Sequence, residues 1–171
     1  MNAPSPATQR HVFSVLVNDE PGVLARVIGL FSGRGYNIES LAVAIVDAER
    51  SLSRITVVSI GTPQILEQIE AQLNRIVPVR KVVDLTRQGA TVEREMALVK
   101  VNGSGASRME ALKVAEAAHA KAKDASPEAF IFEITGTAGE IDNFINLMKP
   151  LGLIETVRSG VLGLARGNKT V

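Results

Sequence analysis

The amino-acid sequence predicts an α+β protein made of two ferredoxin-like βαββαβ units, each an antiparallel sheet with its helices on one face. Short runs rich in valine and isoleucine alternate with segments whose apolar residues recur every three to four positions. The first pattern is typical of strands and the second of amphipathic helices. In the first half of the chain their order is strand, helix, strand, strand, helix, strand, and the second half repeats it more faintly. This order is that of the split βαβ plan.

The first half begins with a β-branched run at 12–17 that stops at a polar residue, Asn18. A helix is predicted next, with one apolar face and with glycines at its end (Leu24, Val27, Ile28, Phe31, then Gly33 and Gly35). Strands are predicted at 38–45 and 52–60, joined by the polar segment 47–50, which suits an antiparallel hairpin. Thr62 and Pro63 are a typical N-cap and first-turn residue for a second helix. A strand at 79–85 closes the unit.

The second half matches the first at several points. Strand 96–101 ends on Asn102 as the first strand ends on Asn18, and strand 130–135 precedes Gly136-Thr137 as Ile60 precedes Gly61-Thr62. A helix follows with an apolar stripe (Ile141, Phe144, Ile145, Met148), and the closing strands begin at Val79 and Ile154, equally far after the two glycines. Segment 120–125 is expected to be the second strand of this unit, although its alanines and lysines have low β-propensity and would also extend the preceding helix.

The polar segment 87–95, which contains Gly89, is the predicted linker between an N-terminal domain at 11–86 and a C-terminal domain at 96–171. Residues 1–10 contain two prolines and no apolar core, which predicts a flexible arm and not a signal peptide. Apolar residues lie on both sides of strand 12–17. We therefore expect the open face or an edge of the first sheet to be covered, most simply by a second copy of the chain.

The composition of the 171 residues excludes several classes of protein. Nineteen basic and 18 acidic residues give no field that would favour nucleic acid or an anionic membrane. The absence of cysteine rules out disulfides, zinc–cysteine sites and a cysteine nucleophile. The apolar run 41–46 is far shorter than the roughly 20 residues that cross a bilayer. These features predict a cytoplasmic protein.

The motifs of catalysis are missing. The two histidines, His11 and His119, have no acidic residue three or four positions on, and the carboxylates sit in turns or at strand ends. Gly103-Ser104-Gly105 lacks the third glycine of a dinucleotide loop because Arg108 stands there, so the loop is expected to start a helix. RNA recognition, which uses the same strand order, needs stacking aromatics, and the chain has five Phe and one Tyr. We predict a non-catalytic protein without a metal or cofactor of its own.

The turn after the first strand contains the parts of an amino-acid site. Backbone N–H groups at a helix start attract a carboxylate, and Gly22 lets a ligand approach them. Asn18 and Asp19 offer oxygens to an ammonium group, and Val23 with Ile38 would enclose a small apolar side chain. The alternative is a purely structural turn in which Asp19 caps the helix, Pro21 starts it and Gly22 permits the bend. The local residues do not decide between the two interpretations.

A resemblance favours the first interpretation. Residues 19–24 resemble the D-x-P-G-V-L signature of ACT domains, which commonly bind amino acids between paired modules. Longer strings resemble the small subunit of acetolactate synthase, also called acetohydroxyacid synthase, over nearly the whole chain (Arg26-Val27-Ile28-Gly29-Leu30-Phe31, Arg34-Gly35-Tyr36-Asn37-Ile38-Glu39-Ser40-Leu41, Leu52-Ser53-Arg54, Val92-Glu93-Arg94-Glu95 and Ser159-Gly160-Val161).

This resemblance implies a regulatory subunit of branched-chain amino acid biosynthesis. It would activate a separate catalytic subunit, which would hold thiamine diphosphate, magnesium and FAD, and would confer allosteric feedback inhibition by valine, or by leucine or isoleucine. The family often has Asn where this chain has Asp19. Position by position, the effector would be held by one group of residues from one chain and a second group from its dimer partner (Asn18, Asp19, Gly22, Val23, Leu24; then Asn37 and Ile38).

The second half has glycines but no adjacent acid in the corresponding turn at 102–105, and it is expected mainly to associate with the catalytic subunit. Its tail, 161–167, is either a docking strand or a frayed end. The rival prediction for the whole chain is a free-standing ACT-domain sensor, or an adaptor for an unrelated enzyme.

Overall fold

The computed structural model describes residues 7–171, and the chain forms two compact units. The first contains the N-terminal part up to Val92 together with 161–171, and the second spans Glu93–Gly160. Residues 1–6 of the predicted arm lie outside the described residues, and the last two positions of that arm, Gln9 and Arg10, already belong to the first strand. None of the helices within 7–171 combines the length and the apolar character that crossing a bilayer requires.

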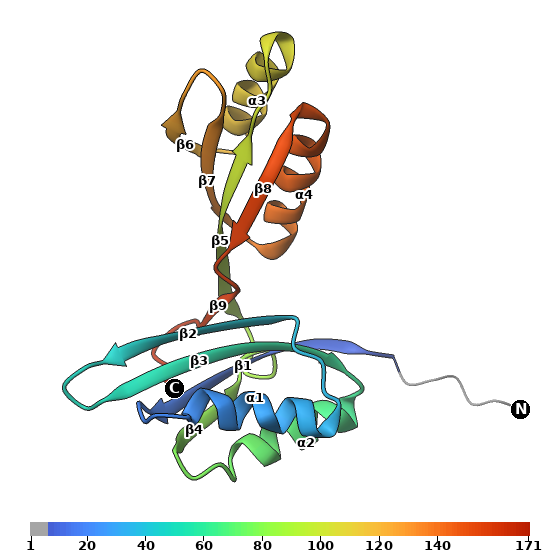
Figure 1. Ribbon diagram of the computed structural model, residues 1–171. Coiled ribbons are helices and arrows are strands. Elements are labelled where there is room, and N and C mark those ends of the chain that lie inside the picture. Colours follow the sequence, from blue (N-terminus) through green and yellow to red (C-terminus); the bar gives the residue numbers. More distant parts are fainter. Residues whose placement is uncertain (1–6) are drawn as a thin grey trace, which may run out of the picture. The chain divides into compact units, whose positions relative to one another are not determined.

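The first unit is a four-stranded antiparallel sheet with two helices on one face, as the sequence predicts (Figure 1). The strand order is β2-β3-β1-β4. Its elements are β1 (Gln9–Asn18), α1 (Val23–Arg34), β2 (Ser40–Asp47), β3 (Leu52–Gly61), α2 (Pro63–Leu73) and β4 (Val79–Asp84). Thr62 caps α2 as expected, accepting a hydrogen bond from the Ile65 N–H, and Pro63 follows in the first turn.

The main core of this unit lies between the sheet and its helices. Alternate residues of β1 (Phe13, Val15, Val17) pack against residues of α1 and α2 that recur at helical spacing (Val23, Val27, Phe31; Leu66, Ile69, Leu73). The period of two in the strand and of three to four in the helices is what brings these side chains to a common layer. The hydrophobic pattern of the sequence therefore specifies the core between the sheet and its helices.

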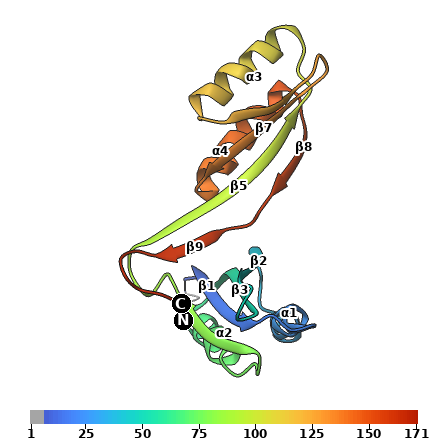
Figure 2. The same ribbon diagram turned by 90° about the vertical axis from the view of Figure 1, so that its left-hand side faces the viewer.

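The second unit repeats the first, with strand order β6-β7-β5-β8 and both helices on one face of the sheet (Figure 2). Its elements are β5 (Thr91–Val101), α3 (Gly105–Ala117), β6 (Lys121–Ala125), β7 (Phe130–Gly136), α4 (Ala138–Met148), the 3₁₀ turn η1 (Lys149–Leu151) and β8 (Leu153–Arg158). The last strand of the chain, β9 (Leu162–Ala165), lies outside this unit. The uncertain segment 120–125 is a strand, because β7 supplies it with a ladder that outweighs its weak propensity. β5 begins within the expected linker 87–95, which is therefore partly strand.

The C-terminal residues differ from the prediction. Residues 161–171 belong to the first unit, not to the second, and they cover part of the sheet face that is turned away from the helices. The side chain of Val161 is buried there against four apolar residues of that face (Val12, Val58, Val83, Leu85), and Ala165 and Val171 pack beside it. The Val161 N–H donates to the Ser40 Oγ at 2.8 Å. The expectation that another copy of the chain covers this apolar face is wrong for this patch, because the chain covers it itself.

Replacing Val161 by Ala removes two methyl groups from this buried cluster, and we expect the first unit to lose about 1–3 kcal/mol of unfolding free energy. Leu162→Ala is the matched control, because the Leu162 side chain is 56% exposed and its truncation should change stability by less than about 0.5 kcal/mol. Urea unfolding followed by the fluorescence of Tyr36, the single tyrosine in a chain without tryptophan, reports on the first unit. Equal losses in the two variants would contradict the covering role of Val161.

Candidate functional site

The turn between β1 and α1 is fixed by backbone hydrogen bonds to the neighbouring connections. The Asn18 N–H donates to the Pro78 carbonyl at 2.9 Å, and the Asp19 N–H donates to the Ser51 carbonyl at 2.7 Å. These bonds join the end of β1 to the turns that precede β4 and β3, so the turn has a defined conformation before any ligand binds. Gly22 then starts α1 as its N-cap, with a left-handed backbone at φ 84°.

No side chain caps α1. The structural alternative, in which Asp19 caps the helix and Pro21 starts it, is wrong: α1 begins at Val23, and the Asp19 Oδ1 accepts a hydrogen bond from the Ser53 Oγ at 3.0 Å instead. Of the helix-start N–H groups, that of Val23 donates to the Glu20 carbonyl at 3.2 Å. Within residues 7–171, the N–H groups of Gly22 and Leu24 have no acceptor. The start of α1 therefore presents partial positive charge to the solvent.

The two polar side chains of the turn differ in what they can offer a ligand. The Asn18 Oδ1 accepts from the Arg80 Nε at 2.6 Å, and its Nδ2 donates to the Glu20 Oε1 at 3.2 Å, so both ends of this amide are engaged. The Asp19 carboxylate uses one oxygen for the Ser53 hydroxyl and leaves Oδ2 without a partner among the described residues. Asp19 is thus better placed than Asn18 to receive a cation.

The apolar part of the predicted site is arranged differently from the expectation. The Val23 side chain is only 6% exposed and lies in the main core of the unit, so its contribution to a ligand is limited to the backbone. Leu24 and Ile38 are half-buried at the margin of the same core. These two side chains, not Val23, are the apolar surfaces that a ligand can reach.

One chain does not bring the whole predicted set together. Asn37 and Ile38 follow the C-terminal end of α1, whereas 18–24 precedes its N-terminal end, and a helix of 12 residues separates them by about 18 Å. The Asn37 side chain is exposed, and its carbonyl accepts from the Ser59 Oγ at 2.6 Å. The two groups of residues therefore cannot both contact one amino acid within a single chain.

β2 offers a surface that the sequence interpretation did not single out. It is an edge strand of its sheet, and three of its apolar side chains are about half exposed: Val43 at 47%, Ile45 at 61% and Val46 at 51%. An apolar edge strand with free backbone groups is a typical site of strand pairing with another chain. The signal was present in the sequence, because 41–46 is apolar on both faces, which an exposed edge strand does not need.

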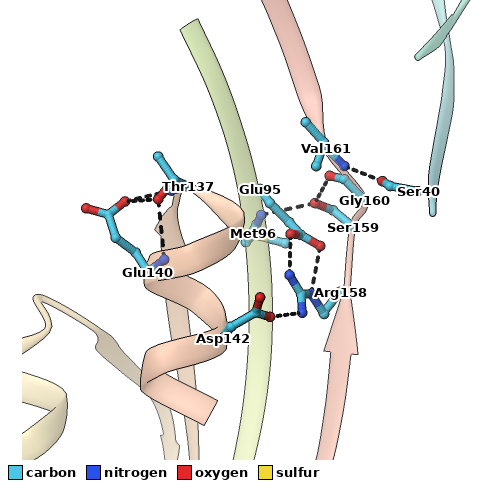
Figure 3. A network of polar contacts seen from close by, with 10 residues as sticks. All are labelled: Ser40, Glu95, Met96, Thr137, Glu140, Asp142, Arg158, Ser159, Gly160 and Val161. Carbon is cyan, nitrogen blue, oxygen red and sulfur yellow. Dashed lines mark hydrogen bonds and ion pairs between the residues drawn. The ribbon is translucent and has the colours of Figure 1, made fainter. Parts of the chain in front are cut away.

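A second polar cluster lies where the chain leaves the second unit (Figure 3). Arg158 donates from Nε and Nη2 to the two carboxylate oxygens of Glu95, at 2.8 and 2.6 Å, and from Nη1 to the Asp142 Oδ1 at 2.5 Å. Hydrogen bonds to Glu95 raise the pKa of the Arg158 guanidinium, and burial opposes them. Beside this cluster the Met96 N–H donates to the Ser159 Oγ at 3.0 Å, and the Ser159 N–H donates to the Met96 carbonyl at 2.9 Å. These contacts fix β8 to β5 just before the chain continues to Val161.

Comparison with known proteins places these features in a family. Residues 13–81 match the model of the AHAS small subunit-like ACT domain, and residues 94–167 match the model of the small subunit of acetolactate synthase. The first unit is thus an ACT-type domain. Residues 7–171 contain no group of three His, Cys, Asp or Glu side chains that could hold a metal ion.

Relatives match over nearly their whole lengths. The chain is 45% identical to the acetolactate synthase isozyme 3 small subunit of Escherichia coli, over 94% of this chain and 98% of that protein. It is 41% identical to the acetolactate synthase small subunit of Mycobacterium bovis, over 98% and 97%. The crystal structure of the small subunit from Thermotoga maritima superposes with a TM-score of 0.85 at 36% identity, over 94% and 99%. The chain belongs to the acetolactate synthase small subunit family.

The left-handed backbone of Gly22 gives a test of how the turn is built. An added Cβ would meet open space both at Gly22 and at Gly29, which lies in the middle of α1, so only the backbone conformation distinguishes the two positions. Gly22→Ala should lower the unfolding free energy of the first unit by about 1–2 kcal/mol. Gly29→Ala should raise it by about 0.5–1 kcal/mol, because alanine favours the helix. Tyr36 fluorescence in urea measures both, and stabilisation by Gly22→Ala would refute the left-handed helix start.

Proposed function

We propose that this chain is the regulatory subunit of an acetolactate synthase. In this proposal it activates a thiamine-diphosphate-dependent catalytic subunit in the cytoplasm and makes that enzyme sensitive to valine, as feedback on branched-chain amino acid biosynthesis. Thiamine diphosphate, magnesium and FAD belong to the catalytic partner. The similarity to named small subunits, which extends over both units, carries the proposal. The uncapped start of α1 beside a free carboxylate oxygen supports the effector site.

In the proposed site, each charged group of the effector meets a group of opposite charge. The α-carboxylate accepts hydrogen bonds from the N–H groups of Gly22 and Leu24, where the partial positive charge of α1 favours an anion. The ammonium group pairs with the free Oδ2 of Asp19, while Asn18 holds the turn through Arg80. The distance between the two groups of residues, here two half-sites, excludes Asn37 and Ile38 of the same chain from this ligand. Those two residues must come from a second copy.

A homodimer through β2 would supply that second copy. The exposed apolar residues of this edge strand require cover, and residues 161–171 bury a different surface of the sheet. Strand pairing between two β2 edges satisfies the free backbone groups and buries Val43 and Ile45. It also brings the α1 to β2 connection of one chain toward the other chain, because Asn37 and Ile38 lie just before β2.

Acetolactate formation by the purified catalytic subunit, measured with and without this chain and with increasing valine, tests the proposal. Activation and a new sensitivity to valine are expected. An unchanged activity would refute the role of activator, and the absence of any binding heat with valine, leucine or isoleucine would refute the effector site. Pull-down of a different enzyme would favour the rival prediction, a free-standing ACT-domain sensor or adaptor.

Gly22→Asp should abolish inhibition by valine and leave activation within about twofold of the unaltered chain. The new carboxylate lies at the helix start, where it repels the effector's carboxylate and competes for the same N–H groups. Gly139→Asp in α4 is the matched control, because it adds the same charge where a Cβ also meets open space. Loss of activation together with inhibition would instead indicate misfolding of the first unit.

Ile45→Lys should convert the proposed dimer to monomers, since each β2 edge would then carry a charge into the interface. Sedimentation equilibrium measures the mass, and calorimetry should show that binding of valine is lost along with the dimer. Val77→Lys, at a side chain that is 93% exposed, should alter neither. Dimers that persist in Ile45→Lys with normal binding would show that the half-sites are completed in another way.

A further inference from the structure

The second unit contains an open cavity of about 300 Å³ between the end of α3, strand β7 and helix α4. Apolar side chains (Ile134, Phe144, Leu147) form part of its lining, and the polar side chains of His119, Glu140 and Asn143 lie at the same cavity. This volume is at the lower end of the range for ligand pockets and fits one ring or one branched alkyl group. Nothing in the proposed effector site uses these residues.

The internal repeat relates the end of α3, at this cavity, to the end of α1. Both α1 and α3 end with the same backbone motif: the Tyr36 N–H donates to the Phe31 carbonyl at 2.9 Å, and the Ala120 N–H donates to the Ala115 carbonyl at 2.8 Å. The residue before each donor has a left-handed backbone, Gly35 at φ 67° and His119 at φ 56°. Ala120 therefore holds the position of Tyr36, and His119 that of Gly35.

In the first unit, Tyr36 carries an aromatic ring at this position. Its ring packs edge-on against Phe31, with centroids 6.1 Å apart, and its hydroxyl donates to the Gln68 Oε1 at 3.2 Å. Gln68 and Asn143 are equally far beyond the glycines Gly61 and Gly136, so Asn143 is the counterpart of Gln68. Ala120 has no ring to place beside Asn143, and Asn143 lines the cavity.

The polar side chains around the cavity favour a cation. The Glu140 Oε2 accepts from both the N–H and the Oγ1 of Thr137, at 2.7 and 2.9 Å, and Oε1 points away from Thr137 without a partner in residues 7–171 (Figure 3). These hydrogen bonds, that of the backbone N–H first, lower the pKa of the Glu140 carboxyl, so it is ionised at neutral pH. No lysine or arginine is among the residues that line the cavity, and the charge of Arg94, outside that lining, also lowers the pKa of the Glu140 carboxyl.

His119 adds an independent observation. Ser51 and His119 are the two non-glycine residues within 7–171 that have a positive φ. A left-handed backbone costs a residue with a Cβ about 1–2 kcal/mol, and glycine occupies the equivalent position in the first unit. This strained residue lies at the cavity, and strained residues of this kind cluster at binding sites.

We propose that this cavity binds an aromatic primary amine. Its ring takes the position that the Tyr36 ring has in the first unit, a ring hydroxyl donates to the Asn143 side-chain carbonyl, and its ammonium group pairs with the Glu140 Oε1. The proposal does not depend on the effector site at Gly22, because no residue is shared between the two sites.

Titration of the full ¹⁵N-labelled chain with four probes tests this site: tyramine, phenethylamine, neutral 4-ethylphenol and anionic 4-hydroxyphenylacetate. Tyramine should bind at millimolar or lower concentration and shift the amides of Ala118, His119 and Asn143. Phenethylamine and 4-ethylphenol should bind about three- to fivefold more weakly, which is the loss of affinity expected when one exposed hydrogen bond or ion pair is removed. The anion should bind most weakly. Absence of amide shifts with all four probes, or shifts confined to other surfaces, would overturn the proposal.

Two substitutions separate the site from a non-specific effect. Ala120→Tyr restores the side chain of the first unit and should abolish binding of tyramine without lowering the melting temperature, whereas Ala125→Tyr on the exposed strand β6 should bind normally. Glu140→Gln keeps an oxygen that can accept from Thr137 and should weaken tyramine about three- to fivefold while leaving 4-ethylphenol unchanged. Undiminished binding of tyramine to Glu140→Gln would overturn the ion pair even if Ala120→Tyr failed to fold.

Discussion

Burial of β1 on both of its faces is the constraint on which the first unit depends. Phe13, Val15 and Val17 pack against the helices, while Val12 packs against Val161 on the opposite face. A strand with apolar residues on both sides cannot stand at the surface of a two-layer sandwich, since one of its faces would be left in water. Recruiting residues 161–171 supplies the missing layer. The same arrangement leaves apolar side chains of β2 exposed at the edge of the sheet.

The candidate effector site lies where β1 ends and α1 begins. β1 stops at Asn18 between two connections that bind its backbone, and Gly22 turns the chain left-handed into α1 without a cap. A capping side chain would satisfy the helix start but would also occupy the place of an incoming carboxylate. In the proposed homodimer, completing the site with a second copy would couple effector binding to association. This coupling is reciprocal: if the effector strengthens association by a given factor, association strengthens effector binding by the same factor.

The sequence predicted most of the fold because its hydrophobic periods agree with its turn signals. Thr62-Pro63 and Gly136-Thr137 located both second helices, and the repeat located even the weak strand 120–125, which propensity alone would not have identified. The fate of Val161 could not be predicted, because a single buried valine far along the chain carries no local sign of its partners. The direction of the Val23 side chain was misjudged for a related reason: it depends on where α1 begins, and Gly22 starts that helix without the capping side chain that usually marks the boundary.

The return of residues 161–171 to the first sheet also sets an order of events during synthesis. At a rate of roughly 5 to 20 residues per second, the first sheet emerges from the ribosome several seconds or more before Val161 does. Throughout that interval one apolar face of β1 is not covered, and β2 is an unpaired edge strand. The nascent chain therefore exposes two apolar surfaces at the same time. A partner subunit or a chaperone that engages the chain early would meet a surface that the finished protein no longer displays.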